Sequence, residues 1–264
     1  MKNKCLFFAT VMLFGILFPS GQAYANGKRE SHIRWELFQK QKIIDDLAEK
    51  IAGSDNFAKY VICLSYIPFC LQLTKLKLNE KDKIKLDEKI VSISTLNFDS
   101  LSVDKKNLLM QDIGLSSFEE FHKIEMSINY HKNNVLKEFK ELNTLGRDDI
   151  QNLLVKAASS DKLKANVVLS LSDCSKTSTL TALRCVGIVL VGSFTSFCIV
   201  MAACVLTAIA LTWWSGGTSI PFAVLGCFEI GTLQYVKGVG GVIIEQCIIE
   251  RFLGDILNCR SIFN

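Results

Sequence analysis

The chain has 264 residues, of which 49% are hydrophobic and 21% charged, and its formal net charge is only +4. No basic stripe points to a nucleic-acid partner. Ten cysteines are present, and in an exported protein such cysteines are more often joined in disulfides than bound to a metal. The interpretation of these cysteines therefore depends on whether the protein is exported.

The N-terminus has the three parts of a cleavable secretory signal peptide. Lys2 and Lys4 form a positive n-region, residues 5–18 are apolar, and Ala23 and Ala25 make the small-x-small triplet that a signal peptidase requires. We expect cleavage after the second alanine and export of the mature chain. The alternative is an uncleaved anchor, but about 14 apolar residues is short for a span, which needs about 20.

Charged residues are distributed very unevenly along the mature chain. Only nine lie in residues 174–264, and residues 185–228 contain none. We therefore predict, after the signal peptide 1–25, a charged helical domain at 26–160 and a polar linker at 161–173 that a protease can cut. A hydrophobic, cysteine-rich domain would occupy residues 174–264.

The charged domain shows helical periodicity. Apolar residues recur at helical spacing in residues 35–51, and Gly53 is well placed to end that helix. A capping box at Ser116 and Ser117, with Glu119 and Glu120 three residues later, predicts the start of a second helix. Its apolar stripe continues to Gly146, and a shorter helix follows at 148–158.

Cys63 and Cys70 lie in an apolar run at residues 60–73 that contains Pro68. On an unbroken helix they would be about 10.5 Å apart, too far for a disulfide, which needs Cα atoms within about 7 Å. A turn at the proline would close that gap. Two interpretations stay open, a disulfide across a turn and two buried thiols.

The hydrophobic domain reads as a Gly- and Cys-rich helical hairpin followed by a third, amphipathic helix, so the predicted fold class is all-α. Gly216 and Gly217 end the first helix, and Pro221 lies at the start of the second. Trp213 and Trp214 beside this turn favour a membrane interface, where tryptophan rings anchor at headgroup depth. Packing against the helical domain is the alternative for the pair.

The hairpin also predicts which of the seven cysteines in this domain are joined. Antiparallel helices place residues at equal distances from the turn side by side, and a third antiparallel helix continues that register. The predicted bridges are nested: Cys204–Cys227, Cys185–Cys247 and Cys174–Cys259. Cys198 is left over, facing lipid, the helical domain or a partner chain.

No motif for catalysis was found among Gly-x-Ser-x-Gly, Walker, Cys-x-x-Cys and His-Glu-x-x-His patterns. Glu119, His122 and Glu125 share one helix face, but on a charged helix such a trio is more typical of a solvated face than of a metal site. We therefore predict no enzyme, no metal or other cofactor and no small-molecule substrate.

Residues 217–230, GTSIPFAVLGCFEI, combine a Gly-x-x-Ile-Pro turn, an apolar stretch, a cysteine six residues after the proline and an acidic residue close behind. This segment resembles the core of halocin-like bacteriocins of the microhalocin type. The resemblance implies an exported precursor whose C-terminal part is a hydrophobic, cysteine-rich peptide. It also implies that the N-terminal part takes part in self-protection of the producer.

These observations together predict a secreted precursor of an antimicrobial peptide that acts on a target-cell membrane. Its own N-terminal helical domain would be the second partner. The alternative is an envelope protein in which a transmembrane helix near 186–212 anchors the helical domain outside the cytoplasm.

Overall fold

The computed structural model describes residues 27–76, 78–93, 96, 100–175, 194–195, 198 and 254–263. Within these ranges the chain forms seven α-helices and one 3-10 helix, and no strand, which confirms the all-α class. The chain divides into two units, residues 1–42 and 43–264. The predicted hairpin lies outside the described residues, apart from Phe194, Thr195 and Cys198 in its first helix.

Helix α2 (Gly27–Ala52) belongs to both units. In the first unit its apolar side chains at Trp35, Leu37 and Phe38 are exposed. In the second unit Ile43 is exposed, whereas the apolar residues on one helix face, at positions i, i+3, i+4 and i+7, are buried: Ile44, Leu47, Ala48 and Ile51. The turn at Gly53 directly after the helix confirms the predicted end.

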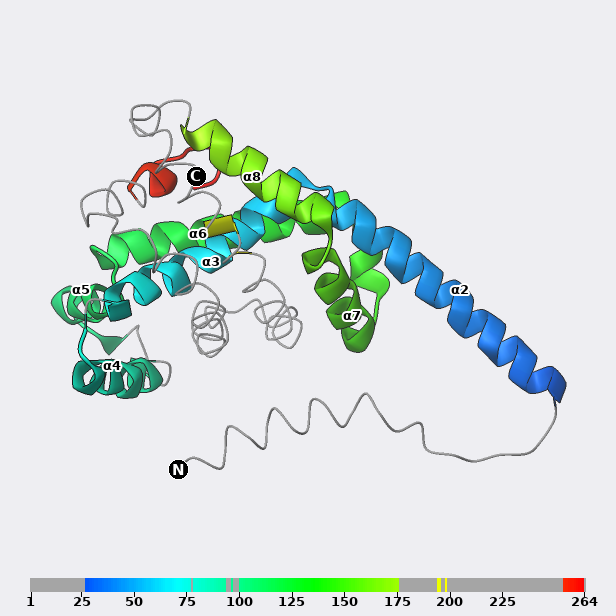
Figure 1. Cartoon of the computed structure of the whole chain (residues 1–264), viewed down its shortest axis with the longest axis horizontal. Coiled ribbons are helices and arrows are strands. Elements are labelled where there is room, and N and C mark those ends of the chain that lie inside the picture. Colours follow the sequence, from blue (N-terminus) through cyan, green and yellow to red (C-terminus); the bar gives the residue numbers. More distant parts are fainter. Residues whose placement is uncertain are drawn as a thin grey trace. The chain divides into compact units, whose positions relative to one another are not determined.

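Helix α3 (Asp55–Leu76) is the centre of the second unit. Almost every side chain in residues 57–71 is buried, as expected for a helix that is apolar on all sides. Helices α6 (Phe118–Glu138) and α8 (Asp161–Ser175) both pack against it (Figure 1). The helix continues through Pro68, so the turn that a disulfide between its two cysteines would need is not formed.

Two further helices, α4 (Glu80–Ile93) and α5 (Val103–Asp112), precede α6. The predicted capping box at the start of α6 is confirmed. The Ser117 hydroxyl accepts a hydrogen bond from the Glu120 amide at 3.2 Å, and the Glu120 carboxylate accepts one from the Ser116 amide at 2.6 Å. These contacts satisfy amides that a helix start otherwise leaves without a partner.

The apolar stripe predicted to run to Gly146 is divided between two elements. Helix α6 ends at Glu138, and a 3-10 helix, η2 (Lys140–Thr144), follows and buries Leu142. Helix α7 (Arg147–Ala158) then matches the predicted short helix.

The prediction of a polar linker at 161–173 is wrong. These residues form α8, whose Leu163, Val167 and Leu171 are buried at helical spacing. The Asn166 amide group donates a hydrogen bond to the Ala52 carbonyl at 3.1 Å. Burial of this apolar face stabilises α8 against α3. Helix α8 is therefore part of the same packed structure as α3. We call residues 43–175 the helical body.

Candidate functional site

The last described part of the chain, residues 254–263, docks on the helical body, and we call it the C-terminal segment. It begins with one helical turn at residues 254–257. Its apolar side chains at Ile256, Ile262 and Phe263 are all buried. The segment belongs to the hydrophobic half in sequence, yet its Phe263 ring and its backbone contact helices α3 and α6 of the charged half.

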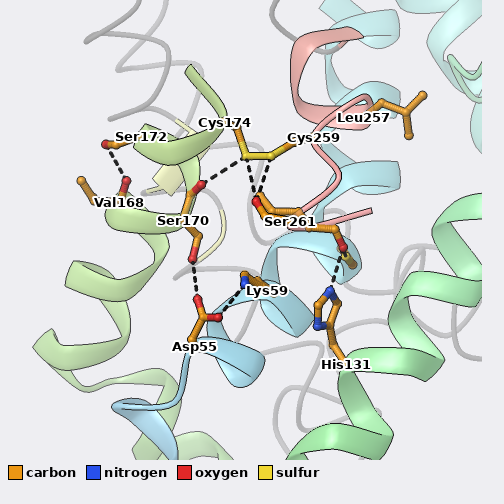
Figure 2. The surroundings of a disulfide bond; sticks show 12 residues. Asp55, Lys59, His131, Val168, Ser170, Ser172, Cys174, Leu257, Cys259 and Ser261 are labelled. Carbon is orange, nitrogen blue, oxygen red and sulfur yellow. Dashed lines mark hydrogen bonds and ion pairs between the residues drawn. A yellow bond between two sulfur atoms is a disulfide. The ribbon is translucent and has the colours of Figure 1, made fainter. Parts of the chain in front are cut away.

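A disulfide joins the C-terminal segment to α8 (Figure 2). It connects Cys174 in the last turn of that helix with Cys259, whose Cα atoms are 5.4 Å apart. This is the pair expected for the outermost of the three nested bridges. The other cysteines of the predicted set lie outside the described residues: Cys185, Cys204, Cys227 and Cys247.

Two side chains of α6 bind backbone carbonyl groups of the C-terminal segment. The Lys123 ammonium donates a hydrogen bond to the Leu257 carbonyl oxygen at 2.8 Å. The His131 Nε2–H donates one to the Ile262 carbonyl oxygen at 2.7 Å, and Figure 2 shows this ring pointing from α6 toward the segment. Both carbonyl groups therefore have a partner in the helical body, which a buried backbone requires.

His131 is buried, and its environment keeps it neutral. Burial lowers the pKa of its imidazole, and the nearby Lys59 ammonium lowers it further, whereas the Ile262 carbonyl and the Asp55 carboxylate oppose these effects. Asp55 itself accepts hydrogen bonds from Lys59 at 2.5 Å and from Ser170 of α8 at 3.4 Å. Among the described residues, Nδ1 of His131 has no hydrogen-bond partner.

Helix α3 contributes an aromatic ring and a thiol to the same contact. The Phe263 ring meets the Tyr66 ring edge-to-face, with centroids 5.4 Å apart, a geometry that aromatic pairs favour. The Cys63 thiol donates a weak hydrogen bond to the Ile262 carbonyl oxygen at 3.7 Å. The end of the chain is therefore fixed by α3 and α6 together.

Cys63, Cys70 and Cys198 are buried free thiols, so the buried-thiol interpretation of the first two is correct. Burial raises the pKa of the Cys63 thiol well above its usual value, and it raises that of Cys198 to about 12. A protonated thiol is a poor nucleophile. These groups therefore fill space in the core.

Two described positions of the apolar run also lie against α3. Cys198 lies close to α3, because the Ser65 side chain lowers the pKa of its thiol and Cys198 in turn raises the pKa of the Cys63 thiol. The Phe194 ring contacts Phe69, with centroids 4.6 Å apart. Of the three environments left open for Cys198, the structure therefore has it facing the helical half.

The remaining predicted positions fall into two groups. Glu119, His122 and Glu125 lie on α6, where the exposed His122 ring contacts the Glu125 carboxylate at 3.4 Å, and no metal-binding group is found among the described residues. The others lie outside the described residues: the signal-cleavage residues Ala23 and Ala25, the interface pair Trp213 and Trp214, and the turn residues Gly216, Gly217 and Pro221.

Sequence reasoning did not single out His131 or Lys123 as residues of this site. One signal was present, because His131 falls on the apolar face of α6, with Ile124, Ile128 and Val135 at helical spacing. A histidine on such a face must find a hydrogen-bond partner inside the protein. The identity of that partner, a carbonyl group 131 residues away, could not be found from spacing.

No protein-family model, no curated protein and no solved structure matches the chain. The resemblance to halocin-like precursors therefore stays a prediction. Among the described helices, none is both long and apolar enough to cross a membrane. Of the range 186–212, the described positions are Phe194, Thr195 and Cys198, all buried.

Proposed function

We propose that the chain is an exported precursor of a membrane-active antimicrobial peptide, a bacteriocin, and that the helical body keeps its hydrophobic C-terminal part inactive until release. The observation that supports this proposal is the docked C-terminal segment. Its buried apolar side chains and its two carbonyl groups bound by α6 join the hydrophobic half to the charged half, and its disulfide to Cys174 fixes it beside the end of α8.

The proposed activity is physical disruption of a target-cell membrane, so it needs no catalytic residue and no cofactor. Removal of apolar surface from water contributes about 25 cal/mol per Å². The uncharged residues 185–228 would supply that surface, and Trp213 and Trp214 would anchor at the interface. While the hydrophobic half is docked, part of its apolar surface is used in contacts with α3, so less is available to lipid.

Release requires a cut in the chain, which we place between residues 157 and 174. Ser159 and Ser160 lie between α7 and α8 and are the residues of that range outside a helix. A cut there leaves both cysteines of the described bridge in the C-terminal fragment. Mass spectrometry of the culture supernatant tests this step. Finding only the intact chain 26–264 would contradict it.

Dye release from liposomes tests the inhibition itself. We expect peptide 174–264 to permeabilise the vesicles and the chain 26–264 to leave them intact. Equal leakage from both would show that the helical body does not inhibit, and no leakage from either would contradict membrane activity. Replacing Trp213 and Trp214 by Ala in the peptide should weaken binding to the vesicles.

The second candidate function is an envelope protein anchored by a transmembrane helix near 186–212. The absence of charge from this range favours it. We rank it second because Phe194 and Cys198 are buried against α3. A full-length protein that resists carbonate extraction from cell membranes would favour the anchor over the precursor.

A further inference from the structure

The disulfide at the site joins two parts of the molecule that are otherwise held only by noncovalent contacts. Cys174 belongs to the helical body, because α8 buries an apolar face on α3 and its Lys162 pairs with Glu49 of α2 at 2.8 Å. Cys259 belongs to the C-terminal segment. The two cysteines are 85 residues apart in sequence, and the whole uncharged run lies between them.

The two cysteine residues differ in their exposure to solvent. Cys174 is buried with 6% exposure, whereas Cys259 is only partly buried. The Ser261 hydroxyl lies 3.1 Å from the Cys259 sulfur and 3.9 Å from the Cys174 sulfur (Figure 2). Cys259 is therefore the more accessible target for a thiol from solution, and the Ser261 hydroxyl lies within hydrogen-bond reach of both sulfur atoms.

We propose that Cys174–Cys259 is a reducible latch, and that its reduction by a thiol undocks the C-terminal segment from the helical body. A thiolate attacks the Cys259 sulfur, forming a mixed disulfide, and the Cys174 sulfur leaves with the bonding electron pair and takes up a proton. A second thiolate then attacks the reductant sulfur of the mixed disulfide, and the Cys259 sulfur leaves with the bonding electron pair and takes up a proton. Two reductant thiols become one disulfide, and both cysteines become thiols.

Undocking follows from what remains after reduction. Among the described residues, the segment is then held by three buried apolar side chains and by the hydrogen bonds from Lys123, His131 and the Cys63 thiol. Its position near α8 is no longer enforced, so docking has to close a long loop and order the segment at an entropic cost. A role of this reduction in releasing a toxin rests on the proposed function. The effect of reduction on docking of the segment does not.

The latch also determines what a cut in the chain can release. A cut before Cys174 leaves the bridge within the C-terminal fragment, where it joins the two ends of that fragment. Any cut between Cys174 and Cys259 leaves the two pieces covalently linked until a thiol reduces the bridge. Release by such a cut would therefore need two events, proteolysis and reduction.

Hydrogen exchange of the intact chain, followed by mass spectrometry with and without dithiothreitol, tests the latch. We expect amide exchange in residues 254–263 to accelerate by roughly 30-fold or more on reduction, the factor at the lower end of a typical disulfide contribution. Peptides from α3 and α6 should keep their protection. Unchanged exchange in 254–263 would overturn the proposal, and so would a parallel loss of protection in α3 and α6, because the bridge would then stabilise the entire fold.

The Cys174→Ser variant isolates this bridge from any formed by the other cysteines. Without reductant it should exchange like reduced wild type, and dithiothreitol should cause no further change in residues 254–263. A further large acceleration would assign the effect to another disulfide and contradict the proposal. The wild-type chain is reduced only after it has folded, so its exchange with and without dithiothreitol tests the proposal even if the variant folds poorly. Dye release is not measured here, so failure of the toxin proposal is a separate result.

Discussion

Phe263 is the apolar anchor of the C-terminal segment, and its replacement by Ala is the sharpest test of docking. The side chain is 1% exposed, and its ring contacts Tyr66. Truncating a fully buried Phe to Ala removes the transfer free energy and leaves a cavity, a total cost of about 3–5 kcal/mol. The segment is held by few contacts besides this ring and can undock instead of keeping the cavity, so we expect about 3 kcal/mol, the lower end of that range.

Urea unfolding followed by far-UV circular dichroism measures this change in the free energy of unfolding. Leu169→Ala is the matched control, because Leu169 lies on α8 with 61% exposure and its truncation should change stability by less than about 0.5 kcal/mol. A Phe263→Ala variant as stable as this control would refute the reasoning, since the C-terminal segment would then contribute nothing to the fold.

Three further predictions concern other contacts of the same structure. The pKa of His131 is lowered from 6.5 in the docked state, so the undocked form binds the proton first; docking should be complete above about pH 6.5 and weaken as the pH falls below it. Hydrogen exchange of residues 254–263 against pH measures this, and His131→Gln should remove the dependence. Gly114→Ala should destabilise the chain by more than about 1 kcal/mol in urea unfolding, because Gly114 has φ 88° and an added Cβ would lie 2.9 Å from the Cys70 carbonyl oxygen. Ser117→Ala should cost about 1 kcal/mol in the same assay through loss of the cap on α6.

Each of these predictions has an outcome that contradicts it. Docking that strengthens on acidification, or an unchanged pH profile in His131→Gln, would mean that this ring does not control the segment. A stabilising Gly114→Ala would show that the turn does not have a positive φ. A Ser117→Ala variant with wild-type stability would mean that the cap contributes nothing.

The helices of the charged half were predictable where one local signal was strong. The capping residues at Ser117 and the spacing of apolar residues in α2 and α6 each specify structure within a few turns. Helix α8 was missed because its polar residues cluster as they do in linkers, while the large apolar side chains on its buried face are few: Leu163, Val167 and Leu171. A helix whose stability comes from packing against α3 has a weak signal of its own.

The site was less predictable than the helices. The pairing of Cys174 with Cys259 could be predicted from the register of antiparallel helices, because a disulfide can join only cysteines and the chain has few of them. The partners of Lys123 and His131 are backbone carbonyl groups, which every residue carries. Side-chain identity therefore gave no indication of where the C-terminal segment would bind.

Peptide mapping of the unreduced protein tests the docked C-terminal segment most directly. Free thiols are first alkylated under denaturing conditions, and the protein is then digested without reductant and analysed by mass spectrometry. We predict one linked pair of peptides that contains Cys174 and Cys259, with Cys63, Cys70 and Cys198 alkylated. Cys259 found alkylated, or joined to a cysteine other than Cys174, would contradict the docked arrangement.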